Sequence, residues 1–246
     1  MSENLLELTD VYTDIAQYHI LHGVNLAVPK GGMTVLLGRN GAGKSTTLRT
    51  IMGLWPPRAG SVTFRGEDIA GQATSKIAQN GIAFVPEDMG IFGALTVAEN
   101  MLLAARSGPI DGDRLEWIYD LFPAMKRFWD LPAGVLSGGQ KQMLAISRAI
   151  VEPRDLLLID EPTKGLAPAI VSAMVDAFRE LKGDTTILLV EQNFFFARAL
   201  GDQVAVIDDG RIVHAGPMAE MAADDQLQQS LLGLSLDGAN QTGARP

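Results

Sequence analysis

The stretch MTVLLGRNGAGKST, residues 33–46, decides the fold expected for this chain. Residues 33–37 form a compact apolar run of the kind that a parallel sheet buries on both faces. The residues after it satisfy the pattern G-x-x-x-x-G-K-[ST], in which glycines let successive backbone N–H groups turn inward around a phosphate. A strand, a glycine-rich loop and a helix in this order predict a phosphate-binding loop. A plain glycine-rich turn before a helix is the weaker alternative.

Each part of this loop has an expected role. The inward-turned backbone and the positive N-terminal end of the following helix suit the β-phosphate of a nucleotide. Lys44 is expected to reach the β- and γ-phosphate oxygens, and the Ser45 hydroxyl is expected to bind Mg²⁺. The expected nucleotide-binding residues are Gly38, Asn40, Gly41, Gly43, Lys44, Ser45 and Thr46.

A second apolar run, residues 156–159, ends in the two acids Asp160 and Glu161. A carboxylate at a strand end beside a phosphate loop can hold the Mg²⁺ shell, and the next carboxylate can orient or deprotonate an attacking water. We therefore expect Asp160 to bind the metal and Glu161 to be the catalytic base. Without the phosphate loop upstream, the same pair would more often be a solvated strand end.

The remaining apolar runs indicate two layers of strands. Short β-type runs at residues 5–8, 24–28 and 62–64 predict an antiparallel β-layer near the N terminus. Runs at residues 33–37, 82–85, 156–159 and 186–190 predict buried strands of a mostly parallel sheet, because helical patterns lie between them. The chain is therefore expected to be α/β, with a P-loop NTPase core.

Helical patterns fill the space between the predicted strands. Thr96 and Glu99 form a capping box that starts one helix, and apolar residues at helical spacing over 171–181 predict another that Gly183 stops. The stretch from about residue 88 to 152 has helical patterns and no convincing strand. We interpret it as a helical subdomain inserted into the core.

Residues 136–140 read LSGGQ at the start of a helical pattern. Ser137 and Gln140 form a capping box, so a plain helix start would explain Ser137 alone. The whole pentapeptide, placed between the phosphate loop and the Asp-Glu strand, is more specific. With these motifs the sequence resembles the ATP-binding subunits of ABC transporters, whose signature is LSGGQ, over nearly its whole length.

The resemblance implies a head-to-tail dimer that hydrolyses ATP with Mg²⁺. In such a dimer the signature of one subunit, Ser137, Gly138, Gly139 and Gln140, closes over the γ-phosphate held by the phosphate loop of the other. A helix N-terminus with exposed N–H groups suits that anion. Residues 165–168 lie where the family has its D-loop, which contacts the partner subunit. A helix-initiating turn explains any single residue of that stretch equally well.

Three positions depart from the general family pattern. Glu87 replaces a Gln that usually contacts the metal and the membrane subunit; its oxygen can still bind Mg²⁺. Gln192 stands where most members have His, and its amide can donate a hydrogen bond to the γ-phosphate but cannot titrate. The position at which the family has an aromatic residue that stacks on adenine is occupied here by Ile15. Tyr12 or Tyr18 could take that role instead, and an ordinary surface or packing role is the alternative for each.

The segments VPED, MGIFGALTVAEN, DEPTKGLAP and LLVEQN resemble the LivF-type ATPases, which energise uptake of branched-chain amino acids and related amides. Urea-uptake ATPases look similar. The resemblance implies a second ATPase subunit, transmembrane permease subunits and, indirectly, an extracytoplasmic solute-binding protein. A related ATPase in a heterodimer is the expected second subunit, with a homodimer as the alternative. The permease is expected to dock on the helical subdomain and the Glu87 loop, with Ile91, Phe92 and Leu95 as docking or core residues. A soluble ABC ATPase without a transporter is the alternative from another class.

Composition limits the other classes. Among 246 residues, 20 Lys and Arg against 29 Asp and Glu give a formal charge of −9, which argues against a nucleic-acid partner. The absence of cysteine excludes a thiolate zinc site and a cysteine nucleophile. No apolar run approaches the ~18 residues that span a bilayer, so we expect the chain on its own to be soluble. The family resemblance implies a peripheral position at the cytoplasmic face of the membrane. Residues 1–236 are expected to form a single ABC ATPase domain, and residues 237–246 a disordered tail.

Overall fold

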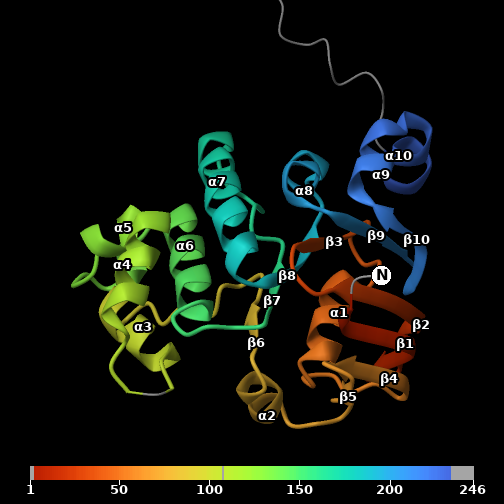
Figure 1. Ribbon diagram of the computed structural model, residues 1–246, viewed down its shortest axis with the longest axis horizontal. Coiled ribbons are helices and arrows are strands. Elements are labelled where there is room, and N and C mark those ends of the chain that lie inside the picture. The colour runs from red at the N-terminus through yellow and green to blue at the C-terminus, as the bar shows by residue number, and fades with distance from the viewer. Residues whose placement is uncertain (1–2, 107, 234–246) are drawn as a thin grey trace, which may run out of the picture.

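The computed structural model describes residues 3–106 and 108–233 of the chain. Two β-sheets lie beside one another and helices cover them (Figure 1). The tail expected at residues 237–246 lies outside the described residues. Within the described ranges, no helix is both long enough and apolar enough to cross a membrane.

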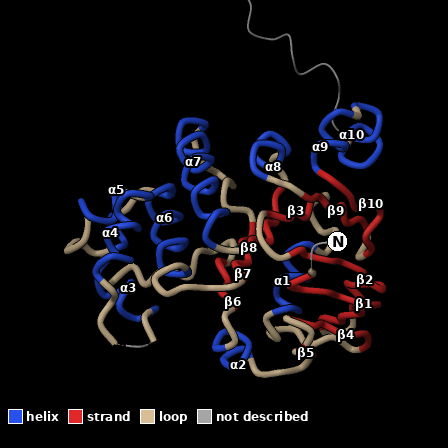
Figure 2. Tube along the Cα trace, in the orientation of Figure 1, coloured by secondary structure: helices blue, strands red, loops and turns tan. Residues whose placement is uncertain are grey.

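The elements alternate between strands and helices along most of the chain (Figure 2). The strands are β1 (Asn4–Ile15), β2 (Tyr18–Pro29), β3 (Met33–Leu37), β4 (Ala59–Phe64), β5 (Glu67–Asp68), β6 (Ile82–Val85), β7 (Leu156–Asp160), β8 (Thr186–Glu191), β9 (Gln203–Asp208) and β10 (Arg211–Pro217). The helices are α1 (Lys44–Ile51), α2 (Thr74–Gln79), α3 (Val97–Ala104), α4 (Gly112–Leu121), α5 (Pro123–Arg127), α6 (Gly138–Ala149), α7 (Pro168–Asp184), α8 (Phe194–Leu200), α9 (Met218–Ala223) and α10 (Asp225–Leu232), with a short 3₁₀ helix at Ala133–Val135.

The larger sheet has the strand order β10-β9-β3-β8-β7-β6. Its strands run parallel except β10, which forms an antiparallel hairpin with β9. The four parallel strands predicted from the apolar runs are present, which confirms the α/β fold class. β9 was not predicted, although its apolar residues 204–207 are of the same kind. It pairs with β3 and places the phosphate-loop strand inside the sheet.

The smaller sheet is antiparallel, with the order β2-β1-β4-β5. This confirms the predicted N-terminal β-layer, whose strands β1 and β2 extend to 12 residues each. Backbone hydrogen bonds join it to the larger sheet through one turn: the N–H of His22 donates to the carbonyl of Gly210, and the N–H of Gly210 donates to the carbonyl of Ala42 in the phosphate loop. The two sheets are therefore connected directly at the loop.

Helices α3 to α6 follow β6 and gather on one side of the molecule, away from α1 (Figure 1). The Thr96 capping box forms as predicted, and within residues 88–106 and 108–152 β-pairing is limited to an isolated bridge between Thr96 and Pro132. The predicted stop at Gly183 was wrong by one residue, because α7 continues through Gly183 to Asp184. The N–H of Thr185 still bonds to the carbonyl of Leu181, so glycine here takes the ordinary helical conformation.

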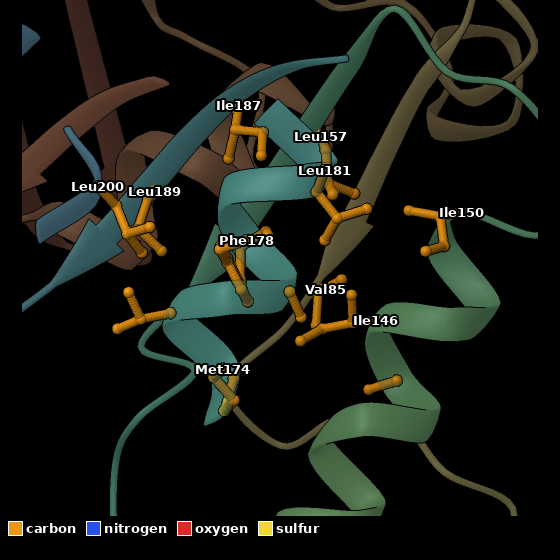
Figure 3. Packing of buried hydrophobic residues seen from close by; sticks show 14 of the residues in the cluster. Val85, Ile146, Ile150, Leu157, Met174, Phe178, Leu181, Ile187, Leu189 and Leu200 are labelled. Atoms are coloured by element: carbon orange, nitrogen blue, oxygen red, sulfur yellow. The ribbon is translucent and has the colours of Figure 1, made fainter. Parts of the chain in front are cut away.

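The hydrophobic core lies on both faces of the larger sheet. Alternate residues of each strand point to opposite faces, so Leu157 packs in one cluster and Leu158 in the other. Figure 3 shows part of one of these clusters, to which Phe178 and Leu181 of α7 and the sheet residue Ile187 belong. A sheet buried on both faces gives the loops at its edge a rigid support.

Candidate functional site

Four loops meet at one edge of the larger sheet. β3, β8, β7 and β6 are parallel neighbours, so their carboxyl ends lie at the same edge, where open α/β sheets bind ligands. These ends and the loops that leave them carry the phosphate loop 38–43, Asp160, Glu161, Glu87, Glu191 and Gln192. The predicted acids and the phosphate loop are therefore close in space.

The phosphate loop needs glycine at two points. Gly38 passes so close to the β9–β10 hairpin that a Cβ there would meet the carbonyl oxygen of Ile207 at 2.3 Å. Gly43 is the N-cap of α1 with a φ of 109°, a conformation that residues with a Cβ rarely adopt. The loop thereby turns into the helix and leaves the first N–H groups of α1 directed toward the pocket above it.

Lys44 is buried and bonded to its own loop. Its Nζ donates to the carbonyl oxygens of Gly38 at 3.0 Å and Arg39 at 3.1 Å, and it lies 3.2 Å from the Oε1 atom of Glu161. Lys44 is 4% exposed and Glu161 is 8% exposed. Such a pair is only weakly screened by solvent, so it holds both side chains at the floor of the site.

Glu161 has an unusual backbone. Its φ of 44° lies in the left-handed region, which costs on the order of 1–3 kcal/mol for a residue other than glycine unless its surroundings fix it. The N–H of Glu161 donates to the carbonyl of Val190 in the neighbouring strand β8 at 2.9 Å. That bond holds the turn, and the turn directs the carboxylate back toward Lys44.

Asp160 is fully buried at the end of β7. Its Oδ1 atom accepts a hydrogen bond of 3.0 Å from the hydroxyl of Ser45, whereas its Oδ2 atom makes no hydrogen bond within the described part of the chain. Burial raises the pKa of Asp160 from 3.8 to about 6, although the Ser45 bond acts in the opposite direction. A buried carboxylate oxygen without a partner is the donor that a cation would require.

Glu87 lies at the same edge and forms an ion pair with Lys164, a residue for which the sequence motifs predicted no role. The Nζ of Lys164 donates to the Oε1 of Glu87 at 2.5 Å and lies 3.7 Å from the Oε2 of Glu161. The hydrogen bond to Glu87 raises the pKa of Lys164. One exposed ammonium therefore connects the loop after β6 with the loop after β7.

Two pockets share this edge. One of about 380 Å³ lies over the phosphate loop and is lined by Ile20, Asn40, Gly41, Gly43, Lys44, Ser45, Thr46, Glu87, Glu161 and Lys164. The other, of about 310 Å³, is lined by Glu161, Thr163, Lys164, Glu191, Gln192 and Asn193. Glu161 and Lys164 belong to both. Gln192 therefore shares a pocket with Glu161 and does not line the pocket over the phosphate loop. A smaller third pocket is lined by Gln192 together with Gly38 and Arg39 at the start of that loop.

The structure places the signature residues elsewhere. Ser137 is the exposed N-cap of α6, where its N–H donates to Gln140 and its Oγ accepts from the Gln140 N–H, as the capping box predicts. Among the described residues, the lining of the phosphate-loop pocket includes none of Ser137, Gly138, Gly139 and Gln140. Within a single chain, the signature and the phosphate loop are therefore not parts of the same pocket.

The residues weighed for adenine stacking lie in the β1–β2 hairpin. Ile15 pairs with Tyr18 across the turn, and Tyr18 is 63% exposed. Tyr12 packs under the guanidinium of Arg58, whose carbon lies 5.5 Å from the ring centroid. Ile20, which sequence reasoning passed over, lines the phosphate-loop pocket.

Sequence reasoning also passed over Lys164, Thr163 and Glu191. Lys164 and Thr163 follow the Asp-Glu pair within three residues, and Glu191 directly precedes Gln192. Closeness in sequence to predicted site residues was the available signal. The contacts of Lys164 with Glu87 and of Thr163 with Glu191 could not be predicted, because they join segments far apart in the sequence that the sheet order brings together.

The chain is similar in sequence to ATP-binding proteins of transporters. Residues 21–164 match the family described as ABC transporter. BraG of Pseudomonas aeruginosa, a high-affinity branched-chain amino acid transport ATP-binding protein, is 37% identical over 232 residues, which are 93% of this chain and 100% of BraG. LivF of Archaeoglobus fulgidus, a probable branched-chain amino acid transport ATP-binding protein, is 34% identical over 222 residues, which are 89% of this chain and 94% of LivF.

A solved structure has the same fold. It is the dimeric structure of a post-hydrolysis state of an ATP-binding cassette bound to ADP and Pi, and it superimposes with a TM-score of 0.75 at 25% sequence identity. The match covers 87% of this chain and 98% of that cassette.

Proposed function

This chain belongs to the ABC transporter family of ATP-binding proteins, and on that premise we propose that its ATP hydrolysis drives import of branched-chain amino acids or related amides. The observation that carries the proposal is the meeting of Lys44, Ser45 and Glu161 at one pocket, with the buried Asp160 hydrogen-bonded to Ser45. Full-length similarity to BraG supports the substrate class.

Binding of the nucleotide changes the partners of Lys44. On binding, the triphosphate replaces the Glu161 carboxylate and the Gly38 carbonyl as the partner of the Lys44 ammonium, while the N–H groups of the loop and of α1 take the β-phosphate. Glu161, released from Lys44, directs a water toward the γ-phosphorus. Gln192 donates its amide to the γ-phosphate from the neighbouring pocket.

The residues at this edge fit a Mg²⁺ ion. The unpartnered Oδ2 of buried Asp160 and the hydroxyl of Ser45 are oxygen donors of the kind that Mg²⁺ prefers, and Glu87 offers a third when Lys164 releases it. Bound there with ATP, the ion would supply charge neutralisation at the phosphate oxygens. When Glu87 binds the ion, the ammonium of Lys164 would keep its contact with the carboxylate of Glu161.

A second ATPase subunit completes the site. Its signature would face the γ-phosphate held here, and the Ser137–Gln140 segment of this chain would face the nucleotide of the partner, because the N-terminus of a 12-residue helix attracts an anion. The partner is proposed to be a related ATPase in a heterodimer. The dimeric arrangement of the structurally similar cassette supports a two-subunit site.

The permease would dock beside the loop after β6. A pocket of about 630 Å³ lies there, lined by Pro86, Asp88, Met89, Gly90 and Arg148 together with residues of α1 and α6. Next to it Phe92 is 51% exposed and lies under the guanidinium of Arg148, whose carbon is 5.3 Å from the ring centroid.

Of the three apolar residues expected to dock, Ile91 packs partly against the core and Leu95 is partly buried, so Phe92 is the exposed member. With the permease docked at this loop, a movement of Glu87 on nucleotide binding would be transmitted to the permease. The chain would then lie at the cytoplasmic face of the membrane, with the solute-binding protein reached only through the permease.

Solute-stimulated hydrolysis by the purified complex tests the function. The complex of this chain with its membrane partners and binding protein, reconstituted in vesicles, should hydrolyse Mg-ATP faster with leucine, isoleucine or valine than without solute. Urea is the control solute, and a complex with Glu161→Gln is the control for hydrolysis. Stimulation by urea alone would favour a urea importer. A chain that co-purifies with no membrane protein would favour the soluble, non-transport ATPase.

A further inference from the structure

A buried carboxylate joins the two loops that carry the hydrolytic side chains. Glu191, at the end of β8, is 2% exposed and accepts four hydrogen bonds. Its Oε1 accepts from the N–H of Thr163 at 3.2 Å and from the hydroxyl of Thr163 at 2.7 Å. Its Oε2 accepts from the N–H groups of Gln192 and Asn193, both at 3.0 Å. Each oxygen thus serves a different loop.

Only an acceptor with two equivalent oxygens meets both sets of donors. An amide in the same place would direct its NH₂ group at the N–H donors of one loop, because Gln has a single acceptor oxygen. Burial raises the pKa of Glu191, whereas the four donors act in the opposite direction. A buried carboxyl is retained at a cost in stability unless it is fully bonded, and this one is fully bonded.

The two loops held by Glu191 are those of Glu161 and Gln192. Thr163 lies two residues after Glu161, whose left-handed turn is bonded on its other side to Val190, the residue before Glu191. Gln192 is bonded through its own N–H. The end of β8 therefore sets the position of the water-directing carboxylate and of the γ-phosphate amide relative to each other.

We propose that Glu191 is a positioning residue for ATP hydrolysis, which fixes Glu161 and Gln192 in one geometry through its hydrogen bonds to Thr163, Gln192 and Asn193. The inference rests on the roles proposed above for Glu161 and Gln192. Within the described residues, the Glu191 side chain makes no hydrogen bond or ion pair with the phosphate loop or Lys44, and it does not line the pocket over that loop. Its loss should therefore slow the chemical step and leave ATP binding largely intact.

Steady-state kinetics of four variants test the proposal. They are Glu191→Gln, Thr163→Val, Thr163→Ser and Glu161→Gln, each in the complete transport complex with the partner's own ATP site disabled. Glu191→Gln should lower kcat roughly ten- to a hundredfold with KM for Mg-ATP changed less than about twofold, since misplaced orienting groups cost rates of this order. Thr163→Val should lower kcat less, and Thr163→Ser, which keeps the hydroxyl, should restore it.

A matched control separates positioning from stability. Thr185 is buried like Thr163, and its hydroxyl donates to the carbonyl of Arg154 at 2.6 Å outside the site. Thr185→Val should lower the melting temperature to a similar degree as Thr163→Val while kcat stays at the wild-type value. The double variant Thr163→Val/Glu191→Gln should be no slower than Glu191→Gln alone, because both changes break one linkage.

Two results would overturn the inference, and they are distinguishable from failure of the function itself. If Glu161→Gln abolishes turnover but Glu191→Gln keeps kcat within about twofold, Glu191 is a structural cap. The same holds if Thr163→Val and Thr185→Val affect kcat equally, a comparison that stands even where Glu191→Gln fails to fold. If Glu161→Gln itself retains full turnover, the proposed role of Glu161 fails first.

Discussion

The ammonium of Lys44 lies 3.2 Å from the carboxylate of Glu161, so the side chain expected to bind phosphate and the side chain expected to direct water neutralise each other. Both are buried, and binding of the triphosphate must separate them. Removing one partner of a buried pair leaves the other charge uncompensated. Changes at the two positions should therefore have different consequences, depending on which charge is left behind.

Lys44→Ala removes the cation and leaves Glu161 facing the phosphates as a bare negative charge. We expect most Mg-ATP turnover to disappear, by at least about a hundredfold, together with a marked loss of ATP affinity. Lys30→Ala, at an exposed lysine, is the control for the change in net charge. The phosphate-loop assignment is wrong if purified Lys44→Ala hydrolyses Mg-ATP at the rate of Lys30→Ala.

Glu161→Gln leaves Lys44 free of its carboxylate partner while keeping the shape of the side chain. The variant should bind ATP at least as tightly as the wild type, lose hydrolysis, and accumulate as an ATP-bound closed dimer. Gel filtration with Mg-ATP, in the presence of the ATPase partner that the chain requires, measures this. A strictly monomeric elution under those conditions would count against a shared site.

The buried Asp160 makes the stability of the nucleotide-free protein depend on pH. Its pKa is raised from 3.8 to about 6, so the folded protein holds this proton more tightly than the unfolded chain. The contribution of Asp160 is therefore most favourable below 3.8 and is lost as the pH rises through about 6.

Asp160→Asn should raise the melting temperature at pH 7.5 by at least about 2 °C, less at pH 5, and should abolish Mg-ATP turnover. Scanning calorimetry without nucleotide measures the first effect, with Asp120→Asn at an exposed carboxylate as control. An unchanged or lower melting temperature of Asp160→Asn at pH 7.5 would contradict the raised pKa.

Gln192 stands where most family members have His, so it tests whether this position works by positioning or by proton transfer. Since an amide donates a hydrogen bond but does not titrate, Gln192→Ala should lower single-turnover hydrolysis on the order of a hundredfold with little effect on ATP affinity. Gln192→His should preserve activity rather than create it. The measurement uses the assembled dimer with the partner's site disabled. If the wild-type assembly binds ATP but cleaves none, this site only holds nucleotide and the role proposed for Glu161 is wrong.

Phe92 tests the docking surface. An aspartate in place of this 51% exposed ring should weaken assembly with the permease while leaving the melting temperature and the ATP affinity of the isolated chain unchanged. Val213→Asp is the control, because Val213 is 49% exposed on β10, at the other end of the sheet order from β6. Co-purification of the membrane subunits measures the effect. Normal assembly of a folded Phe92→Asp protein would exclude docking at this position.

Local pattern predicted the elements well, because buried parallel strands have short apolar runs and helix starts have capping boxes. The strands β3, β6, β7 and β8 and the caps at Thr96 and Ser137 follow from such signals. β9 and β10 were not predicted, although the sequence contains a signal for them. It is an apolar run followed by Asp209-Gly210, a pair that favours a hairpin turn.

The contacts within the site could not be predicted in the same way. The ion pairs of Lys44 with Glu161 and of Lys164 with Glu87 join residues far apart along the chain, and the order of the strands brings them together. Sequence could name which residue types the chemistry needs. It could not show that Lys44 is already paired with Glu161, or that one carboxylate, Glu191, bonds to two loops.

The turn at Gly210 has a mechanical consequence. It receives the N–H of His22 from the antiparallel sheet and gives its own N–H to Ala42 of the phosphate loop. These bonds connect the antiparallel sheet, the β9–β10 hairpin and the phosphate loop, so we expect the three to move as one rigid unit. Under the proposed function, the movement that ATP binding causes would then fall to helices α3 to α6 and the loop before them, where the permease is proposed to dock.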